Sequence, residues 1–469
     1  MDDVMDRVRS IINNKKFRFI VKLLLVGLFI IFSVIIANKH EHWSDEAQSF
    51  LLARDTSFLE VFKYMKYEGT PPLWVLVIKI FIFLGGSYKT FFILPIIFNT
   101  IGLILFEYKI KAPWYIKLLF PFTYFIFFQY TIVARSYCLV FMMLMIIALI
   151  YKRRFDKPIL YAFILFIFMN ISLHTLMISG SFYLIYIIES IIEKKIKLKK
   201  IQWGLALMFV ELLLTAIITY PAADCNFGRS TSQSFFHVLL EATIGSELNV
   251  ILEIVLGIII IGIFLITFKR EKLVNLLILL LPISFVLMFI AFQIWHVGVI
   301  WLLLFSYFII SNQLNESKLI KYFTLLVCLV QGYWSISSVT YDYTNKYSAS
   351  YDTAKYLEEY VDNDKLIYGF GYSKTAIQPY FKENIFDNRV TNKSFNIWKN
   401  GSEELYLLNS FDNGVDVYVI SDFYKQYYLN LIKFLEYSGY ERTEYKGATY
   451  IKDHVYESEG FIIYKKKSE

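Results

Sequence analysis

Up to about residue 340, apolar runs of about 15–20 residues alternate with short polar connections. The first run, Phe19 to Ala37, has no small-x-small cleavage pattern and therefore predicts a retained membrane anchor. Helices of this length can cross a hydrocarbon core of about 30 Å. The remaining runs predict further spans near 90–106, 116–130, 137–151, 158–172, 176–192, 201–219, 249–267, 273–292, 297–311 and 320–337. The pattern predicts a polytopic α-helical membrane protein with about eleven spans.

The segment 38–89 is a long polar loop that contains one short apolar run, Leu73 to Leu84. This run is too short to span a bilayer, so we expect it in the membrane interface. The alternate connections then carry the basic clusters, and the positive-inside rule predicts a cytoplasmic N-terminus in a plasma membrane. These basic residues include Lys109, Lys111, Lys117, Lys152, Arg153, Arg154, Lys157, Lys194, Lys195, Lys197, Lys199, Lys200, Lys269, Arg270, Lys272, Lys318 and Lys321. The short outer connections carry only Arg135 and Arg229.

From about Tyr341 the composition becomes that of a soluble domain. Amphipathic patterns predict two helices, at Ser350–Val361 and Tyr424–Leu435. Short β-branched and aromatic runs predict strands at Lys365–Phe370, Val415–Ile420, Ala448–Ile451 and Phe461–Tyr464. We therefore expect a membrane module over residues 1–340 and a small α/β extracytoplasmic domain over 341–469.

Composition narrows the functional classes. The chain is 57% hydrophobic and only 19% charged, which is outside the range of soluble proteins. The net charge of +7 comes from lysines and arginines spread between spans, so no nucleic-acid partner is expected. The three cysteines form no CxxC pair, which argues against a disulfide framework and a structural zinc site.

Candidate chemistry is concentrated at His40–Gln48, directly after the first span. Asp45 can act as a general base there, with Glu46 beside it as a second catalytic group, but Asp45 and Gln48 also fit a helix-capping box. His40, His42 and Asp45 form a candidate divalent-metal site, although their spacing is not a specific signature and no cofactor is firmly indicated.

Other polar side chains are expected at the same membrane face. Glu68 precedes Pro71 and Pro72, which can hold it towards the loop or can simply begin a helix. An arginine at this depth needs an anionic partner, so Arg135 fits a phosphate, a carboxylate such as Asp45, or lipid headgroups. Further candidates for phosphate or substrate binding at predicted outer helix ends are Tyr137, His174, Arg229, His237 and His296.

Three motifs resemble those of bacterial GT-C glycosyltransferases, in particular protein O-mannosyltransferases and lipid A aminoarabinose transferases. They are Trp43-Ser44-Asp45-Glu46-Ala47, Glu68-Gly69-Thr70-Pro71-Pro72-Leu73-Trp74 and Ala134-Arg135-Ser136-Tyr137. The resemblance extends in architecture over roughly residues 1–340 and does not include the C-terminal domain. The acid that some members carry in the second outer loop is absent, which puts a two-carboxylate metal site in doubt.

The resemblance implies transfer of a sugar from a polyprenyl-phosphate donor to a hydroxyl on the outer face, with inversion. Asp45 would activate the acceptor, which can be a cell-envelope glycan, a lipid or a protein, and Arg135 would hold the lipid phosphate. A lipid-linked sugar flippase without transferase activity is the alternative, and Glu211, an acid at membrane depth, is where that alternative starts. A non-catalytic receptor would not explain the acids of the first loop.

Overall fold

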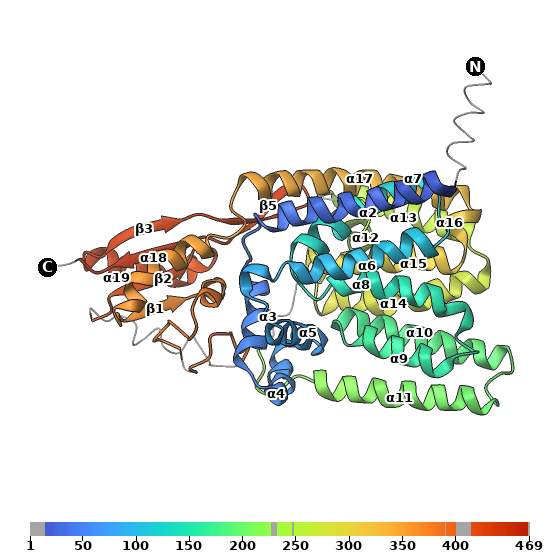
Figure 1. Cartoon of the computed structure of the whole chain (residues 1–469), viewed down its shortest axis with the longest axis horizontal. Helices are drawn as coiled ribbons and strands as arrows, with labels where there is room; N and C mark the ends of the chain where they lie inside the picture. The colour runs from blue at the N-terminus through green and yellow to red at the C-terminus, as the bar shows by residue number, and fades with distance from the viewer. Residues whose placement is uncertain (1–14, 227–231, 246–247, 390, 400–413, 468–469) are drawn as a thin grey trace, which may run out of the picture.

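The computed structural model describes residues 15–226, 232–245, 248–389, 391–399 and 414–467. The described chain is mostly helical and elongated (Figure 1). Long helices run side by side in a bundle, and a smaller part with β-strands lies beyond one end of it. The coarse prediction of a mostly helical chain with a small C-terminal part that contains a sheet is confirmed.

Seven helices among the described residues are long and apolar enough to cross a membrane. They are α2 (Lys15–Ala37), α6 (Ile93–Lys109, preceded by the turn η1, Tyr88–Thr90), α10 (Leu173–Ile192), α11 (Lys199–Thr219), α13 (Val250–Thr267), α14 (Arg270–Phe289) and α17 (Lys318–Thr344). Each coincides with a predicted span. The total of about eleven spans stays a prediction.

The other apolar runs form shorter helices: α8 (Cys138–Ile150, followed by η4, Tyr151–Arg153), α9 (Pro158–Met169) and α15 (Ile294–Ile310). The continuous span predicted at 116–130 is wrong. Pro121 cannot continue a helix, and the chain there divides into α7 (Trp114–Leu119), η2 (Phe120–Phe122) and the π-helix η3 (Phe125–Ile132). Two further short helices are α12 (Phe235–Glu241) and α16 (Gln313–Glu316).

The basic connections meet at the bundle end that faces away from the strands (Figure 1). Lys117 Nζ donates to the Glu107 carbonyl at 2.7 Å, and Lys272 Nζ to the Ser311 carbonyl at 2.7 Å. Asn315 also donates to the Lys111 carbonyl at 3.0 Å. This clustering is what the positive-inside argument requires.

The loop 38–89 folds into three short helices at the opposite end: α3 (Ser44–Asp55), α4 (Phe58–Glu68) and α5 (Leu73–Phe83). Ser57 caps α4 through the backbone N–H of Glu60, and Gly69 ends it in a left-handed conformation with φ 61°. α5 packs on α3, and Lys79 of α5 donates to the Ala53 carbonyl at 2.7 Å. The loop is therefore a structured platform between the two parts.

The C-terminal part has a four-stranded sheet with the order β1-β2-β6-β3, in which only the β1–β2 pair is parallel. Its elements are α18 (Ser350–Asp362), β1 (Ile367–Phe370), η5 (Tyr372–Ala376), η6 (Gln378–Tyr380), β2 (Val417–Ser421), η8 (Asp422–Tyr428), α19 (Leu429–Tyr437), β3 (Glu441–Tyr445), β4 (Ala448–Ile451), β5 (His454–Ser458) and β6 (Phe461–Lys465). Leu357 of α18 packs on one face of the sheet, and Leu431 of α19 on the other.

All four predicted strands are present, but β3 and β5 were not predicted, because their charged, exposed sequences lack the apolar alternation of a strand. The helix predicted at Tyr424 begins only at Leu429, after a 3₁₀ segment. The β4–β5 hairpin leaves the sheet and packs against the bundle. At its tip, the fully buried Lys452 forms an ion pair with Glu241 of α12, and Tyr450 stacks on Tyr341 of α17 with ring centroids 4.2 Å apart.

Candidate functional site

The first turn of α3 places Asp45 and Glu46 on different sides of the helix. The cap predicted at Asp45 is wrong: the N-cap residue is Trp43, whose backbone N–H donates to Glu46 Oε2 at 3.2 Å. Glu46 is fully buried, whereas the Asp45 side chain is 25% exposed. The divergence follows from the rotation of about 100° per helical residue.

Asp45 is held from two distant parts of the chain. Arg135 Nη2 lies 3.0 Å from Asp45 Oδ2, and the Tyr372 hydroxyl donates to Asp45 Oδ1 at 3.1 Å. The predicted pairing of Arg135 with a loop carboxylate is therefore present. Tyr372 comes from η5 in the C-terminal part, so both parts of the protein contact Asp45.

Arg135 follows the π-helix η3 and sits among aromatic rings. Its guanidinium carbon lies 5.0 Å from the Trp295 ring centroid and 5.7 Å from that of Tyr137. Such contacts hold a guanidinium without neutralising its charge. Arg135 Nη1 is buried and has no hydrogen-bond partner among the described residues. This nitrogen is therefore a buried donor left without an acceptor.

Glu46 is the centre of a buried hydrogen-bond network. Its carboxylate contacts His40 Nε2 at 3.0 Å and His42 Nδ1 at 2.7 Å, and it accepts the backbone N–H of Ala134 at 2.6 Å. Ala134 precedes Arg135, and Glu46 follows Asp45. The network therefore fixes both members of the Asp45–Arg135 pair relative to each other.

His40 completes the network through Asp342 Oδ2, 2.9 Å from its Nδ1. Burial disfavours the imidazolium, but the flanking carboxylates of Asp342 and Glu46 prevail and raise the pKa of His40 to about 10. The pKa of Glu46 is lowered, because His40 and His42 outweigh the effect of its burial. At neutral pH the centre is therefore an ion pair.

The candidate metal ligands are grouped differently from the prediction. Among the described residues, His40, His42 and Glu46 offer ligand atoms within 4.8 Å of one another, whereas Asp45 pairs with Arg135. His40 Nδ1 contacts Asp342, the arrangement that orients metal-binding histidines. The set can hold a divalent ion only if the ion replaces the close contacts that Glu46 now makes with both rings.

A cavity of about 710 Å³ opens beside Asp45. It brings together most of the residues predicted for the site, including Glu68, Arg135, Tyr137, His174 and His296. Its lining also includes Gln48, Ser49, Gly69, Thr70, Pro71, Trp74, Ser136, Ser172, Thr219, Pro221, Gln293, Tyr372 and Trp398. Arg229 lies outside the described residues. His237 contacts Glu253 at 2.6 Å and does not line the cavity.

Glu68, another residue of the cavity lining, keeps part of its proton at neutral pH. Glu68 accepts a hydrogen bond from Gln48 Nε2 at 2.7 Å. Burial raises the pKa of Glu68 to about 7, the Gln48 hydrogen bond opposes this, and the Asp45 charge adds to it. Glu68 is thus partly protonated where Asp45 is paired with Arg135, so it can donate as well as accept a hydrogen bond.

His174 and His296, two of the predicted site residues, lie together in the cavity lining. Their ring centroids are 4.5 Å apart, and His174 Nδ1 lies 3.5 Å from the Tyr137 hydroxyl. His174 Nε2 is buried and has no hydrogen-bond partner among the described residues. Arg135 Nη1 and Trp74 Nε1, from two other residues of the cavity lining, are also buried without a partner among the described residues.

The residues that the sequence did not reveal come from the C-terminal part. Tyr372 and Trp398 line the cavity with ring centroids 4.8 Å apart. Glu459 is buried and accepts from Ser44 Oγ at 2.6 Å. Glu457 lies close enough to Asp45 and Arg135 for their charges to affect its pKa, which burial raises to about 7. The only signal in the sequence is the group of tyrosines over 341–380, which includes Tyr372 and suits either sugar stacking or aromatic packing.

The buried carboxyl of Glu459 should make the stability of the fold depend on pH. Burial raises its pKa from 4.5 to about 8, against the Ser44 hydrogen bond and with the help of Glu457. The folded protein therefore keeps a proton that the unfolded chain loses, and stability falls as pH rises through this window. The proton on Glu459 makes the free energy of unfolding fall by at most about 1.4 kcal/mol per pH unit. We therefore expect the melting temperature of Glu459→Gln to decline less steeply than that of the wild type between pH 5 and 8.5. Glu436→Gln, an exposed control in the same part, leaves the slope unchanged, and an unchanged slope in Glu459→Gln contradicts the assignment.

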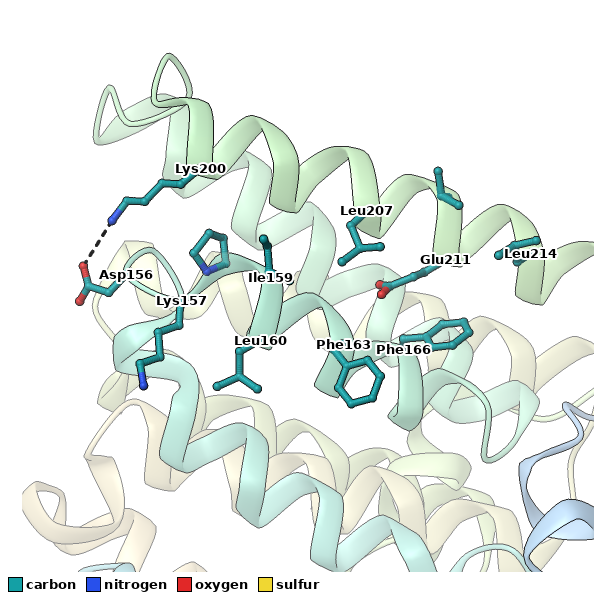
Figure 2. A pocket seen from close by; sticks show the side chains of 12 residues that line it. Asp156, Lys157, Ile159, Leu160, Phe163, Phe166, Lys200, Leu207, Glu211 and Leu214 are labelled. Carbon is teal, nitrogen blue, oxygen red and sulfur yellow. Dashed lines mark ion pairs between the residues drawn. The ribbon is translucent and has the colours of Figure 1, made fainter.

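The structure thus unites Asp45, Glu68, Arg135, Tyr137, His174 and His296 around one cavity and places Glu46 behind them as a support. Glu211 lies elsewhere, on α11 between the helices of a separate groove, where it accepts from the Tyr183 hydroxyl at 2.9 Å (Figure 2). The resemblance to GT-C glycosyltransferases stays a prediction. No protein-family model, no curated protein and no solved structure matches the chain.

Proposed function

We propose that the protein is a membrane glycosyltransferase that moves a sugar from a polyprenyl-phosphate donor to a hydroxyl acceptor on the outer face of the plasma membrane. The observation that carries the proposal is the Asp45–Arg135 pair, 3.0 Å apart, in a cavity where Arg135 Nη1 and His174 Nε2 have no partner in the described chain. The pair sets a carboxylate that can act as a base beside a guanidinium that suits a phosphate.

The donor phosphate fits the wall formed by Arg135 and His174. A guanidinium can use one nitrogen for Asp45 and another for a phosphate oxygen, and the aromatic rings around Arg135 limit its movement. Charge that develops on the leaving phosphate would be stabilised by donors already in place. Tyr137, beside His174, can add a third hydrogen bond.

Asp45 would accept the acceptor's proton as its oxygen attacks the anomeric carbon. The bond between that carbon and the phosphate oxygen breaks, and the electron pair leaves with the lipid phosphate at Arg135. Attack from the side opposite the phosphate inverts the anomeric centre. The acceptor hydroxyl would replace the Tyr372 hydroxyl as the hydrogen-bond donor to Asp45.

The different character of the two bundle ends supports the proposed orientation. The basic connections lie away from the cavity, so the positive-inside rule favours a cytoplasmic N-terminus and an extracytoplasmic cavity and C-terminal part. Acceptors at that face include cell-envelope glycans, lipids and proteins.

The test is transfer of a labelled sugar from a synthetic polyprenyl-phosphate donor by the full-length protein in reconstituted vesicles. Consumption of donor with release of polyprenyl phosphate supports the proposal. A protein that moves the intact donor across the bilayer without cleaving it is a flippase, and that result would overturn the proposal.

Arg135→Lys is expected to raise KM for the donor by roughly 10–100-fold, with a smaller change in kcat. A lysine keeps the positive charge but cannot contact Asp45 and a phosphate through two nitrogens of one planar group. The measurement is initial-rate kinetics with varied donor in vesicles. Arg54→Lys is the matched control, because Arg54 pairs with Asp55 away from the cavity. Equal KM values in both variants would remove Arg135 from the donor site.

A further inference from the structure

The lining of the Asp45 cavity contains two groups of residues with different chemistry. The first group comes from the helical bundle and consists of Arg135, Tyr137, His174 and His296. The second group comes from the loop 38–89 and the C-terminal part and consists of Gln48, Glu68, Tyr372 and Trp398. Asp45 joins the groups, because it contacts both Arg135 and Tyr372. The donor phosphate accounts for the first group and leaves the second without an occupant.

The turn after β1 brings Tyr372 to Asp45. β1 ends at Phe370, and Gly371 follows with φ 83°, a conformation that favours glycine. A Cβ atom at position 371 would lie only 2.8 Å from the side chain of Ser421. η5 begins at Tyr372 and packs on α3. The hydroxyl of Tyr372 therefore reaches Asp45 from a position that the sheet fixes.

Trp398 is held at the cavity by contacts on either side of it in the chain. Gln48 binds the backbone of Asn396 twice, because its Nε2 donates to the carbonyl at 2.8 Å and its Oε1 accepts from the N–H at 2.8 Å. Lys399 Nζ lies 3.1 Å from Asp224 Oδ2. We call Tyr372 and Trp398 the aromatic pair; their ring centroids are 4.8 Å apart and their planes are tilted by 45°.

The second group has the composition of a carbohydrate site. A pyranose ring has an apolar face of C–H bonds and a rim of hydroxyls. Aromatic rings can pack on the apolar face, and neutral side chains that both donate and accept can bind the hydroxyls. Gln48 and the partly protonated Glu68 are such side chains, and they lie beside the aromatic pair in the same lining. Thr70 adds a further hydroxyl.

Peptide and lipid acceptors suit the second group less well. An extended peptide is recognised mainly through backbone hydrogen bonds from a strand edge, whereas the second group lies on helical and irregular segments. A lipid acceptor would bring apolar chains, but α3, η5 and the segment 396–399 are not among the long apolar helices. A sugar uses both the rings and the neutral polar side chains.

We propose that the aromatic pair binds the ring of a sugar acceptor, so that the acceptor is a glycan with one hydroxyl at Asp45. The inference rests on the proposed function, because it takes the base and the donor from there. Its own support is Tyr372, which contacts both Asp45 and Trp398. The acceptor oxygen forms the new glycosidic bond, its proton passes to Asp45, and the lipid phosphate leaves with the electron pair of the broken bond.

A comparison of acceptors tests the assignment, with the full-length protein in vesicles and a labelled polyprenyl-phosphate-sugar donor. The sugar probes are methyl pyranosides and disaccharides of glucose, mannose, galactose and N-acetylglucosamine. They are compared with an acetylated peptide rich in serine and threonine and with diacylglycerol in the bilayer. Faster transfer to a sugar probe than to the peptide or diacylglycerol is expected. Faster transfer to either of these than to any sugar probe overturns the proposal.

Trp398→Leu is expected to raise KM for the sugar acceptor by about five- to tenfold, because a ring face is lost and an apolar side chain remains. KM for the donor, measured from its cleavage by water without acceptor, stays unchanged and shows that the variant is folded. Trp398→Phe should recover most of the lost affinity. Tyr437→Leu is the matched control, because Tyr437 is 95% exposed in the same part and does not line the cavity.

Two results of these kinetics contradict the assignment. An unchanged KM for the sugar acceptor in Trp398→Leu removes the aromatic pair from acceptor binding. A raised KM for the donor instead places the pair at the sugar of the donor.

Saturation-transfer NMR gives a readout that needs neither donor nor transfer. The methyl pyranosides are added to the protein in vesicles, and magnetisation transferred to their C–H protons is measured. A signal in the wild type and Tyr437→Leu that falls severalfold in Trp398→Leu is expected. No signal from any probe, or an equal signal in Trp398→Leu, overturns the inference. If a sugar binds at the aromatic pair but no donor is ever cleaved, the sugar site stands and the transferase proposal fails.

Discussion

Replacement of Asp45 by asparagine is expected to slow sugar transfer by roughly 10²–10⁴-fold, the contribution usual for a general base. Asparagine has nearly the shape of aspartate, but its amide cannot take the proton from the acceptor hydroxyl. The loss should appear mainly in kcat, measured as labelled sugar transferred per protein in vesicles under saturating donor.

The variant should remain folded. Its amide oxygen can still accept from Tyr372, and the lost ion pair with Arg135 is partly exposed, with side-chain exposures of 25% for Asp45 and 17% for Arg135. Such pairs contribute about 1 kcal/mol or less. A melting temperature within a few degrees of the wild type is therefore expected.

Asp55→Asn is the matched control for this prediction. Asp55 is at the other end of α3 and pairs with Arg54 outside the cavity, so the same chemical change there should leave transfer intact. If Asp45→Asn and Asp55→Asn transfer sugar at the wild-type rate, Asp45 is not the base. Glu68 would then be the first residue to examine, because it lines the same cavity.

Replacement of Glu46 by glutamine is expected to cost about 3–5 kcal/mol of folding free energy. The substitution leaves the imidazolium of His40 and the backbone N–H of Ala134 facing an amide that cannot accept from all of them. Thermal unfolding in detergent measures the loss. Glu41→Gln is the control, since Glu41 is half-buried in the same loop and outside the network. A stable Glu46→Gln variant would contradict the role of Glu46 as the central support.

The buried network of Glu46 and His40 also makes the stability of the fold depend on pH. Because the pKa of His40 is raised from 6.5 to about 10, its contribution to stability is complete below pH 6.5 and is lost as pH rises through 10. The wild type should therefore melt at lower temperature as pH rises from 7 to 10. In Glu46→Gln this part of the decline should be smaller, because one of the two carboxylates that hold the proton is gone.

Features that depend on local sequence were predictable. Apolar runs located the long helices, and the acids after the first span identified the loop that carries Asp45. Several of the polar residues singled out in the connections, including Arg135 and His174, line one cavity, whereas His237 does not. These predictions need only the length and polarity of each segment.

Features that depend on long-range packing could not be predicted from the sequence. Tyr372 and Glu459 reach the first turn of α3 across 327 and 415 residues, to Asp45 and Ser44, and neither has a motif. The roles of Asp45 and Glu46 also separate only in three dimensions, since the buried partner Asp342 is 302 residues from His40. The helix α15 is almost entirely buried in protein, which its apolar sequence alone could not distinguish from a lipid-facing span.

The burial of Lys452 at the tip of the β4–β5 hairpin limits how far the C-terminal part can evolve independently of the helical bundle. Lys452 is fully buried against Glu241 of α12, and Tyr372 supplies a hydrogen bond to α3. Substitution around Trp398, which lines the cavity, can change the cavity without altering the long apolar helices. Exchange of the whole segment 341–469 is different, because α12 and α3 would have to be inherited with it.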